Sequence, residues 1–373
     1  IIDGTDFLSD IALAFIAFST GEFFKLPVLK KSGMKVVWIT VFEAVLASVF
    51  IFILTYFILR LDLAFSIVLA ALASATAPAS TMMTIRQTGA KGDFVDTLLQ
   101  VVALDDVVGL VLYSIAISIA LASLSGVSGF SFETLGNPVL LNLLVLLLGS
   151  IFGLFMKLLM PQKRSKDNKL IISVALLFAF CGVCALLDLS PLLGCMVMGT
   201  VYTNIADDDK LFKQLNYFSP PLLLLFFVRS GMSFQLDALI SPAGALDGVP
   251  LLVIGASYFL VRILGKYAGA WLGCRLVGKD RLVRNYLGLA LIPQAGVAIG
   301  LAALGARTLG GAMGSDLQTV ILASSVLYEL IGPGCAKLAL YLSKSYSTKL
   351  EDVVVVEELT ETGEKKTCLL YTS

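Results

Sequence analysis

The stretch Val102-Ala103-Leu104-Asp105-Asp106-Val107-Val108-Gly109 decides the fold, because it puts two adjacent carboxylates inside an apolar run from about residue 96 to residue 122. A carboxylate near the centre of a membrane-length helix is costly, so a functional role is the default interpretation. Successive helical residues point about 100° apart, so the two acids have different partners. We expect one of them to face a cation path and the other to pair with a fixed charge.

The composition indicates a polytopic α-helical membrane protein. Of 373 residues, 58% are apolar and only 14% are charged, and the apolar residues form long runs. The sequence has no histidine, which excludes a His-ligated metal site and leaves proton chemistry to carboxylates, Lys, Cys or Tyr. Cys181 and Cys184 have a metal-like spacing, but they lack a second Cys pair and are interpreted as packing residues. We expect no cofactor and no nucleic-acid partner.

About eleven membrane helices are expected, and basic residues gather in alternate loops between them. The positive-inside rule places these loops, and the C-terminal tail, in the cytoplasm. The first residue is not Met, which we interpret as truncation, and residues 367–373 fit no helix or strand pattern. The helices are expected near residues 7–26, 35–59, 63–85, 96–122, 138–160, 169–187, 191–205, 217–236, 250–277, 285–305 and 317–341.

Proline interrupts two of these helices at matching positions. Pro78 lies in Ser74-Ala75-Thr76-Ala77-Pro78-Ala79-Ser80-Thr81, and Pro293 precedes Gln294 in the helix near residues 285–305. The charge pattern makes the two surrounding helix triplets run in opposite senses. Interrupted helices in inverted halves are typical of a transporter site at the midplane, where freed backbone carbonyls serve a cation. The alternative for each interruption is an ordinary Pro kink.

Several polar residues lie deep in the expected helices. Arg262 needs a counter-charge, which one of the two aspartates can supply. Lys266, one turn further on, is expected to extend towards the cytoplasmic side. Glu43 and Glu329 each pair with Arg262, cap a broken helix, or remain protonated structural acids. The stripe Gly265, Gly269 and Gly273 lets the helix of Arg262 press against a neighbour.

The sequence resembles the monovalent cation–proton antiporter superfamily, of the bacterial sodium–proton antiporter type. The resemblance covers nearly the whole chain in the expected order. Members typically have thirteen helices, which implies that two precede residue 1. The stretches that carry the resemblance are Phe18-Ser19-Thr20-Gly21-Glu22, Ala75-Thr76-Ala77-Pro78-Ala79-Ser80, Leu104-Asp105-Asp106-Val107-Val108-Gly109, Arg262-Ile263-Leu264-Gly265-Lys266 and Glu329-Leu330-Ile331-Gly332-Pro333.

The resemblance implies an all-α, inverted-repeat antiporter fold with two crossed, broken helices at the midplane. It also implies a homodimer in which a core moves like an elevator. The core would comprise residues 35–124 and 246–345, and the dimerisation domain residues 1–34 and 169–245. Residues 125–168 would link them, and residues 346–373 would form a disordered cytoplasmic tail. The resemblance further implies that Asp106 binds the ion and that Asp105 pairs with the base of the ninth helix.

We therefore expect a secondary transporter in a bacterial inner membrane that exchanges Na⁺ for H⁺, with Asp106 as the shared site and Thr76 as a further ligand. K⁺ in place of Na⁺ is the alternative. Electrogenic relatives usually carry Lys where Arg262 stands, and another branch carries Asp where Ala77 stands. Because Arg does not practically lose its proton, an Arg262–Asp105 pair favours electroneutral exchange.

An enzyme and a channel are the other classes considered. An intramembrane aspartyl protease needs two carboxyl groups that face each other, whereas Asp105 and Asp106 are neighbours on one helix and point apart. The sequence also has no Gly-x-Gly-Asp stretch. A passive channel would not need two inverted, broken triplets. The sequence therefore favours a transporter over both.

Overall fold

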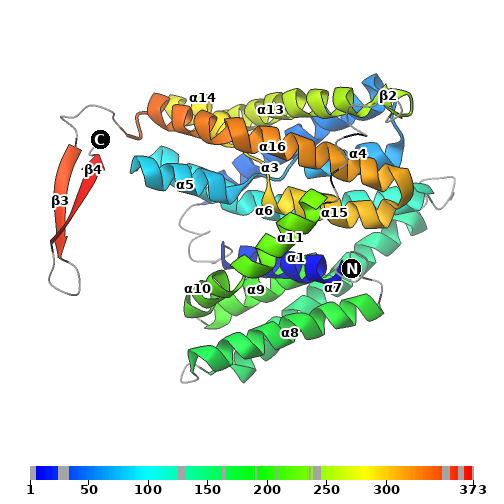
Figure 1. Ribbon diagram of the computed structural model, residues 1–373, viewed down its shortest axis with the longest axis horizontal. Helices are drawn as coiled ribbons and strands as arrows, with labels where there is room; N and C mark the ends of the chain where they lie inside the picture. The colour runs from blue at the N-terminus through cyan, green and yellow to red at the C-terminus, as the bar shows by residue number, and fades with distance from the viewer. Residues whose placement is uncertain are drawn as a thin grey trace.

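The computed structural model of the chain is almost entirely helical (Figure 1). Every helix expected from the sequence has a counterpart. The structure describes residues 6–23, 33–124, 132–161, 165–187, 189, 191–206, 209–232, 234, 237, 245–346, 353–359 and 365–371. The helices without a central break are α1 (Asp6–Thr20) with the 3₁₀ turn η2 (Gly21–Phe23), α3 (Met34–Phe52) with the π-helical end η3 (Ile53–Ile58), α6 (Asp93–Leu124), α7 (Phe132–Leu159), α8 (Lys166–Leu186), α9 (Leu192–Ala206), α10 (Asp209–Phe218), α11 (Pro220–Met232), α13 (Leu251–Leu276) and α16 (Gly311–Leu342).

The length and apolarity of the helices identify an integral membrane protein. In the described part of the chain, five helices are long and apolar enough to cross a bilayer. Large apolar side chains remain exposed on these and on other helices, as lipid-facing residues do, and Leu158, Leu186 and Leu330 are each more than three-quarters exposed. The five are Met34–Ile58, Asp93–Leu124, Asp167–Leu186, Leu251–Leu276 and Gly311–Leu342.

Each of the two Pro-containing spans is broken into two separate helices and is not merely kinked. The first consists of α4 (Leu63–Leu72) and α5 (Pro78–Thr88), and the second of α14 (Arg281–Ala290) and α15 (Gly296–Leu309). Pro78 occupies the first turn of α5, where its missing N–H costs nothing. The two breaks touch, because the N–H of Ala77 donates to the carbonyl oxygen of Pro293 at 2.9 Å.

The helices form two groups in space. Figure 1 shows α3–α6 and α13–α16 on one side of the molecule, and α1 and α7–α11 on the other. The break-containing helices therefore lie in the same group. The separate helix α10 was not expected, because its polar sequence was assigned to a loop and to the start of the following span.

Close packing between α3 and α13 positions two helices that carry buried charge. A Cβ at Gly265 would lie 2.8 Å from the Cα of Ala47, and a Cβ at Gly273 would lie 2.9 Å from the Cα of Ile39. At Gly269, the distance to the Cα of Glu43 would be 2.5 Å. The predicted close approach along this glycine stripe is confirmed, and the neighbour is α3.

The C-terminal segment contains strands where the sequence led us to expect a tail without regular structure. Strand β3 (Val353–Leu359) pairs antiparallel with β4 (Lys365–Tyr371), in the register Val353 opposite Tyr371. β3 begins with four consecutive Val residues, which are β-branched and favour extended backbone. A short hairpin of β1 (Ala245–Leu246) and β2 (Val249–Pro250) precedes α13.

Gly269→Ala is predicted to destabilise the protein, because the new Cβ would overlap the backbone of α3 at Glu43. Overpacking of this kind costs about 1–3 kcal/mol. The matched control is Gly255→Ala in the same helix, where a Cβ meets no atom within 4 Å. Thermal unfolding in detergent should show a lower melting temperature for Gly269→Ala and an unchanged or higher one for Gly255→Ala. Equal melting temperatures for both variants would contradict this account of the packing.

Candidate functional site

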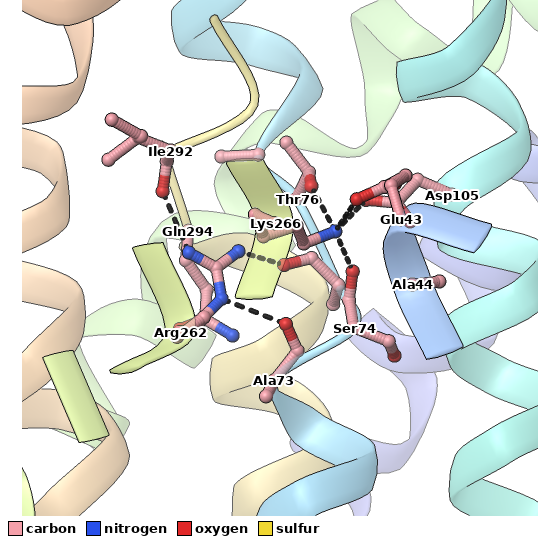
Figure 2. Close-up of polar contacts among 12 residues, drawn as sticks. Glu43, Ala44, Ala73, Ser74, Thr76, Asp105, Arg262, Lys266, Ile292 and Gln294 are labelled. Atoms are coloured by element: carbon pink, nitrogen blue, oxygen red, sulfur yellow. Dashed lines mark hydrogen bonds and ion pairs between the residues drawn. The ribbon is translucent and has the colours of Figure 1, made fainter. Parts of the chain in front are cut away.

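Lys266 of α13 joins two carboxylates from two other helices (Figure 2). Its Nζ lies 2.8 Å from Oδ2 of Asp105 on α6 and 2.8 Å from Oε2 of Glu43 on α3. It also donates to Oγ1 of Thr76 at 2.9 Å and to the carbonyl oxygen of Ser74. The side chains of Lys266, Asp105 and Glu43 are fully buried. The ammonium therefore links α3, α6 and the first broken helix inside the core.

Arg262, one turn earlier on α13, binds backbone rather than an acid. Its Nε donates to the carbonyl oxygen of Ala73 at 2.9 Å, and its terminal nitrogens donate to those of Ala75 at 2.6 Å and Ile292 at 2.8 Å. The guanidinium carbon lies 4.6 Å from the centre of the Tyr328 ring, a cation–π contact. Arg262 is fully buried, and it satisfies carbonyls released by both helix breaks (Figure 2).

The predicted pairing of Arg262 with Asp105 is therefore wrong, and so is the predicted extension of Lys266 towards the cytoplasm. Both bases lie on the same apolar helix, so sequence spacing alone does not decide which one meets the acids. The planar guanidinium offers several donors in a fixed fork, which fits three separate carbonyls, whereas the compact ammonium fits two carboxylates. The argument for electroneutral exchange loses its premise, because the partner of Asp105 is a lysine.

Asp106 is buried without a partner, in contrast to Asp105. It is 3% exposed, and its Oδ1 has no hydrogen-bond partner. Among the described residues, no ion pair or hydrogen bond reaches this side chain. The expectation that the two neighbouring acids face different surroundings is confirmed. Because a buried, unpaired carboxylate is costly, Asp106 is the group of this site that most needs a proton or a cation.

Gly109 brings the first break close to the two aspartates. A Cβ at this position would lie 3.2 Å from Oγ of Ser74 and 3.6 Å from the Cα of Ala75. Gly109 follows Asp105 by one helical turn and therefore lies on the same face of α6. The lack of a side chain at Gly109 thus allows the polar backbone of residues 73–77 to lie against this part of α6.

Gln294 ties the second break to the end of α4. Its Nε2 donates to the carbonyl oxygen of Leu72 at 2.7 Å, and the hydroxyl of Tyr258 donates to its Oε1 at 3.2 Å. Together with the bond between Ala77 and Pro293, this contact holds the two interruptions against each other. The predicted broken-helix residues Pro78, Pro293 and Gln294 therefore all lie at or beside the site.

The two acids left open by the sequence have different surroundings. Glu43 pairs with Lys266. Glu329 of α16 accepts a hydrogen bond of 2.5 Å from Oγ of Ser80, in the first turn of α5. A carboxylate there faces the positive end of the helix dipole. Neither acid pairs with Arg262, so that alternative is wrong. Glu329 bonds a side chain in the first turn of α5, and capping of the free backbone N–H groups there stays a prediction.

Lys266 is the residue of the site that sequence reasoning missed. The sequence carried only a partial signal: Lys266 neighbours the glycine stripe, so it lies near a closely packed face of α13, but the stripe does not say which base meets the acids. Tyr258 and Tyr328 were also not singled out. Among the described residues, no cluster of three or more Cys, Asp or Glu side chains forms a resident metal site.

Fold and site together define a class of protein. Helices that cross a membrane, two interruptions in contact, and buried charges beside them are typical of secondary transporters. The sodium/hydrogen exchanger transmembrane family matches residues 2–339, and the chain belongs to this family. Its relatives are transporters rather than enzymes.

Two relatives illustrate the similarity. The high-affinity Na⁺/H⁺ antiporter NhaS3 of Synechocystis is 23% identical over 188 residues, which are 50% of this chain and 39% of that protein. The chain thus matches well under half the length of this relative. The solved structure of the sodium proton antiporter MjNhaP1 from Methanocaldococcus jannaschii superposes with a TM-score of 0.63 at 18% identity, covering 91% of this chain and 86% of the other. This second likeness shows the fold.

Arg262→Met is predicted to destabilise the core, because it leaves three buried carbonyl oxygens without their donors. An unsatisfied buried polar group costs about 1–3 kcal/mol, so the loss should exceed about 3 kcal/mol. Arg86→Met, at an exposed position of α5, is the matched control. Melting curves of the two purified variants provide the measurement. A melting temperature for Arg262→Met equal to that of Arg86→Met would refute the role assigned to Arg262.

Proposed function

We propose that the protein exchanges Na⁺ for H⁺ across the membrane, with Asp106 as the shared site. One observation carries this proposal: a single ammonium, that of Lys266, lies among three buried acids, Glu43, Asp105 and Asp106. The cluster has one positive charge for three acids, so protons or a cation must supply the rest. A group of acids that alternates between these two ligands is what antiport requires.

Competition between the two ligands gives the exchange. In its buried position, Asp106 is neutralised either by a proton or by a monovalent cation. Thr76 and the carbonyl of Ser74 lie beside the acids and offer oxygen ligands of the kind that Na⁺ prefers. Because the unloaded carboxylate is charged and buried, only loaded states cross, which couples one flux to the other.

The pairing of Lys266 with Asp105 adds a second proton carrier. Unlike the guanidinium of Arg, the ammonium of Lys can act as a proton donor in a protein. A cation that reaches Asp106 competes with the ammonium for the neighbouring Asp105, and Lys266 then releases its proton. We therefore propose two protons per cation and a rate that follows the membrane voltage. This replaces the electroneutral exchange expected when Arg262 was taken as the partner.

Alternating access would come from motion between the two helix groups. The helices that carry the breaks, α3–α6 and α13–α16, would move as a core against α1 and α7–α11. Support comes from the two groups in Figure 1 and from the likeness to a solved antiporter over 91% of the chain. The assembly would be a homodimer in a bacterial inner membrane, with the basic loops and the C-terminus in the cytoplasm.

Asp106→Asn is predicted to abolish exchange and leave the protein folded, since an amide neither takes up and releases a proton nor neutralises a cation. The matched control is Asp96→Asn, an exposed acid nearer the start of the same helix. Proteoliposomes with an internal pH dye report exchange when Na⁺, Li⁺ or K⁺ is added. More than about a tenth of wild-type exchange in Asp106→Asn would sink the assignment. A response to K⁺ alone would move the proposal to the alternative cation.

Lys266→Arg is predicted to keep the charge pair but to remove the second proton, because Arg stays charged throughout. Na⁺-driven exchange in wild-type proteoliposomes should accelerate or slow with an imposed valinomycin–K⁺ potential. Any exchange that remains in Lys266→Arg should be insensitive to it. A wild-type rate indifferent to the potential would overturn the two-proton proposal and leave the antiport proposal standing.

A further inference from the structure

Trp271 of α13 lies between two arginine side chains at the basic end of the core. The guanidinium carbon of Arg275, one turn later on α13, is 5.2 Å from the centre of its ring system. That of Arg284, in the first turn of α14, is 5.8 Å from the same centre. Cation–π contacts therefore hold two guanidinium groups from two helices around one indole.

Neither arginine has an acidic partner in the part of the chain that the structure describes. Among the described residues, no carboxylate lies within ion-pair distance of Arg275 or Arg284. A nearby acid exists but is engaged elsewhere, because Asp93 pairs with Lys279 at 2.8 Å. The Nε of Arg284 is buried and has no hydrogen-bond partner. Among the described residues, two guanidinium groups around Trp271 and one buried N–H donor are thus left without an acid partner.

The seam between α13 and α14 is also closely packed and carries aromatic side chains. A Cβ at Gly288 would lie 2.6 Å from the Cα of Tyr267, so the two helices approach closely there. Tyr267 and Trp271 lie one turn apart on α13 and lead towards Arg275. Before them on the same stripe, Leu260 and Leu264 are 61% and 60% exposed. The stripe therefore passes from apolar, to aromatic, to cationic along the helix.

We propose that this seam binds the headgroup of an anionic phospholipid. The phosphate would be held by Arg275 and Arg284, whose planar forks suit a phosphate, with Trp271 fixing their orientation. An acyl chain would follow Leu264 and Leu260. Aromatic residues belong at the membrane interface, and basic residues beside a membrane attract anionic lipid.

Such a lipid would act on the helices that build the ion site. α13 carries Lys266 and Arg262, and α14 ends at the second break, residues 291–295. A headgroup that contacts both helices would fix their relative position at this end of the core. We therefore expect anionic lipid to stabilise the protein through this seam.

The test measures the melting temperature of the purified full chain in detergent with added phosphatidylglycerol or phosphatidylcholine. Wild type should gain stability from phosphatidylglycerol and not from phosphatidylcholine. The double variant Arg275→Gln/Arg284→Gln should lose this gain, and its phosphatidylglycerol affinity, measured by native mass spectrometry, should fall about fivefold per arginine. Arg275→Lys/Arg284→Lys keeps the charge but not the fork, and should bind more weakly than wild type.

The control is Arg281→Gln. Arg281 is an exposed arginine in the same turn of α14, and it is not one of the two arginines around Trp271. It should keep the phosphatidylglycerol effect. An equal loss in Arg281→Gln would overturn the site in favour of general surface charge, as would full binding by the lysine variant. Inorganic phosphate that stabilises wild type as much as phosphatidylglycerol does would overturn the lipid assignment. An unchanged affinity in the double glutamine variant would also overturn it.

Discussion

The shared ammonium of Lys266 is the interaction on which the rest of the structure depends. A cation buried away from water destabilises the fold unless acids and other acceptors surround it. Here these acceptors are Glu43, Asp105, Thr76 and the carbonyl of Ser74. The glycine stripe of α13 brings α3 within reach, and Gly109 does the same for the first break. Close backbone packing is thus the means by which charge is kept inside.

The second constraint is the backbone left open by two helix breaks. A chain inside a membrane must satisfy its carbonyl and N–H groups internally. Arg262 serves three carbonyls from both breaks, Gln294 serves one, and Ala77 and Pro293 satisfy each other. The two bases of α13 therefore have separate tasks: Arg262 holds irregular backbone in place, and Lys266 takes part in charge balance.

Much of this was predictable from the sequence because it depends on local rules. Long apolar runs define the spans, Pro78 and Pro293 define the breaks, and adjacent positions on a helix separate Asp105 from Asp106. The choice between Arg262 and Lys266 was not predictable in this way. Both lie on α13, and only its packing against α3 and the breaks shows which one meets the acids. The hairpin of β3 and β4 was likewise missed, because the acidic residues of the tail were weighed above its four consecutive Val residues.

The most direct test of the central claim is to count the protons released when Na⁺ binds to the purified protein in weakly buffered detergent solution. If the cation displaces a proton from Asp106 and a second one from the Lys266–Asp105 pair, two protons should appear for each Na⁺ bound, as measured with a pH indicator and calorimetry on the same sample. Saturable Na⁺ binding with no release of protons would contradict the account.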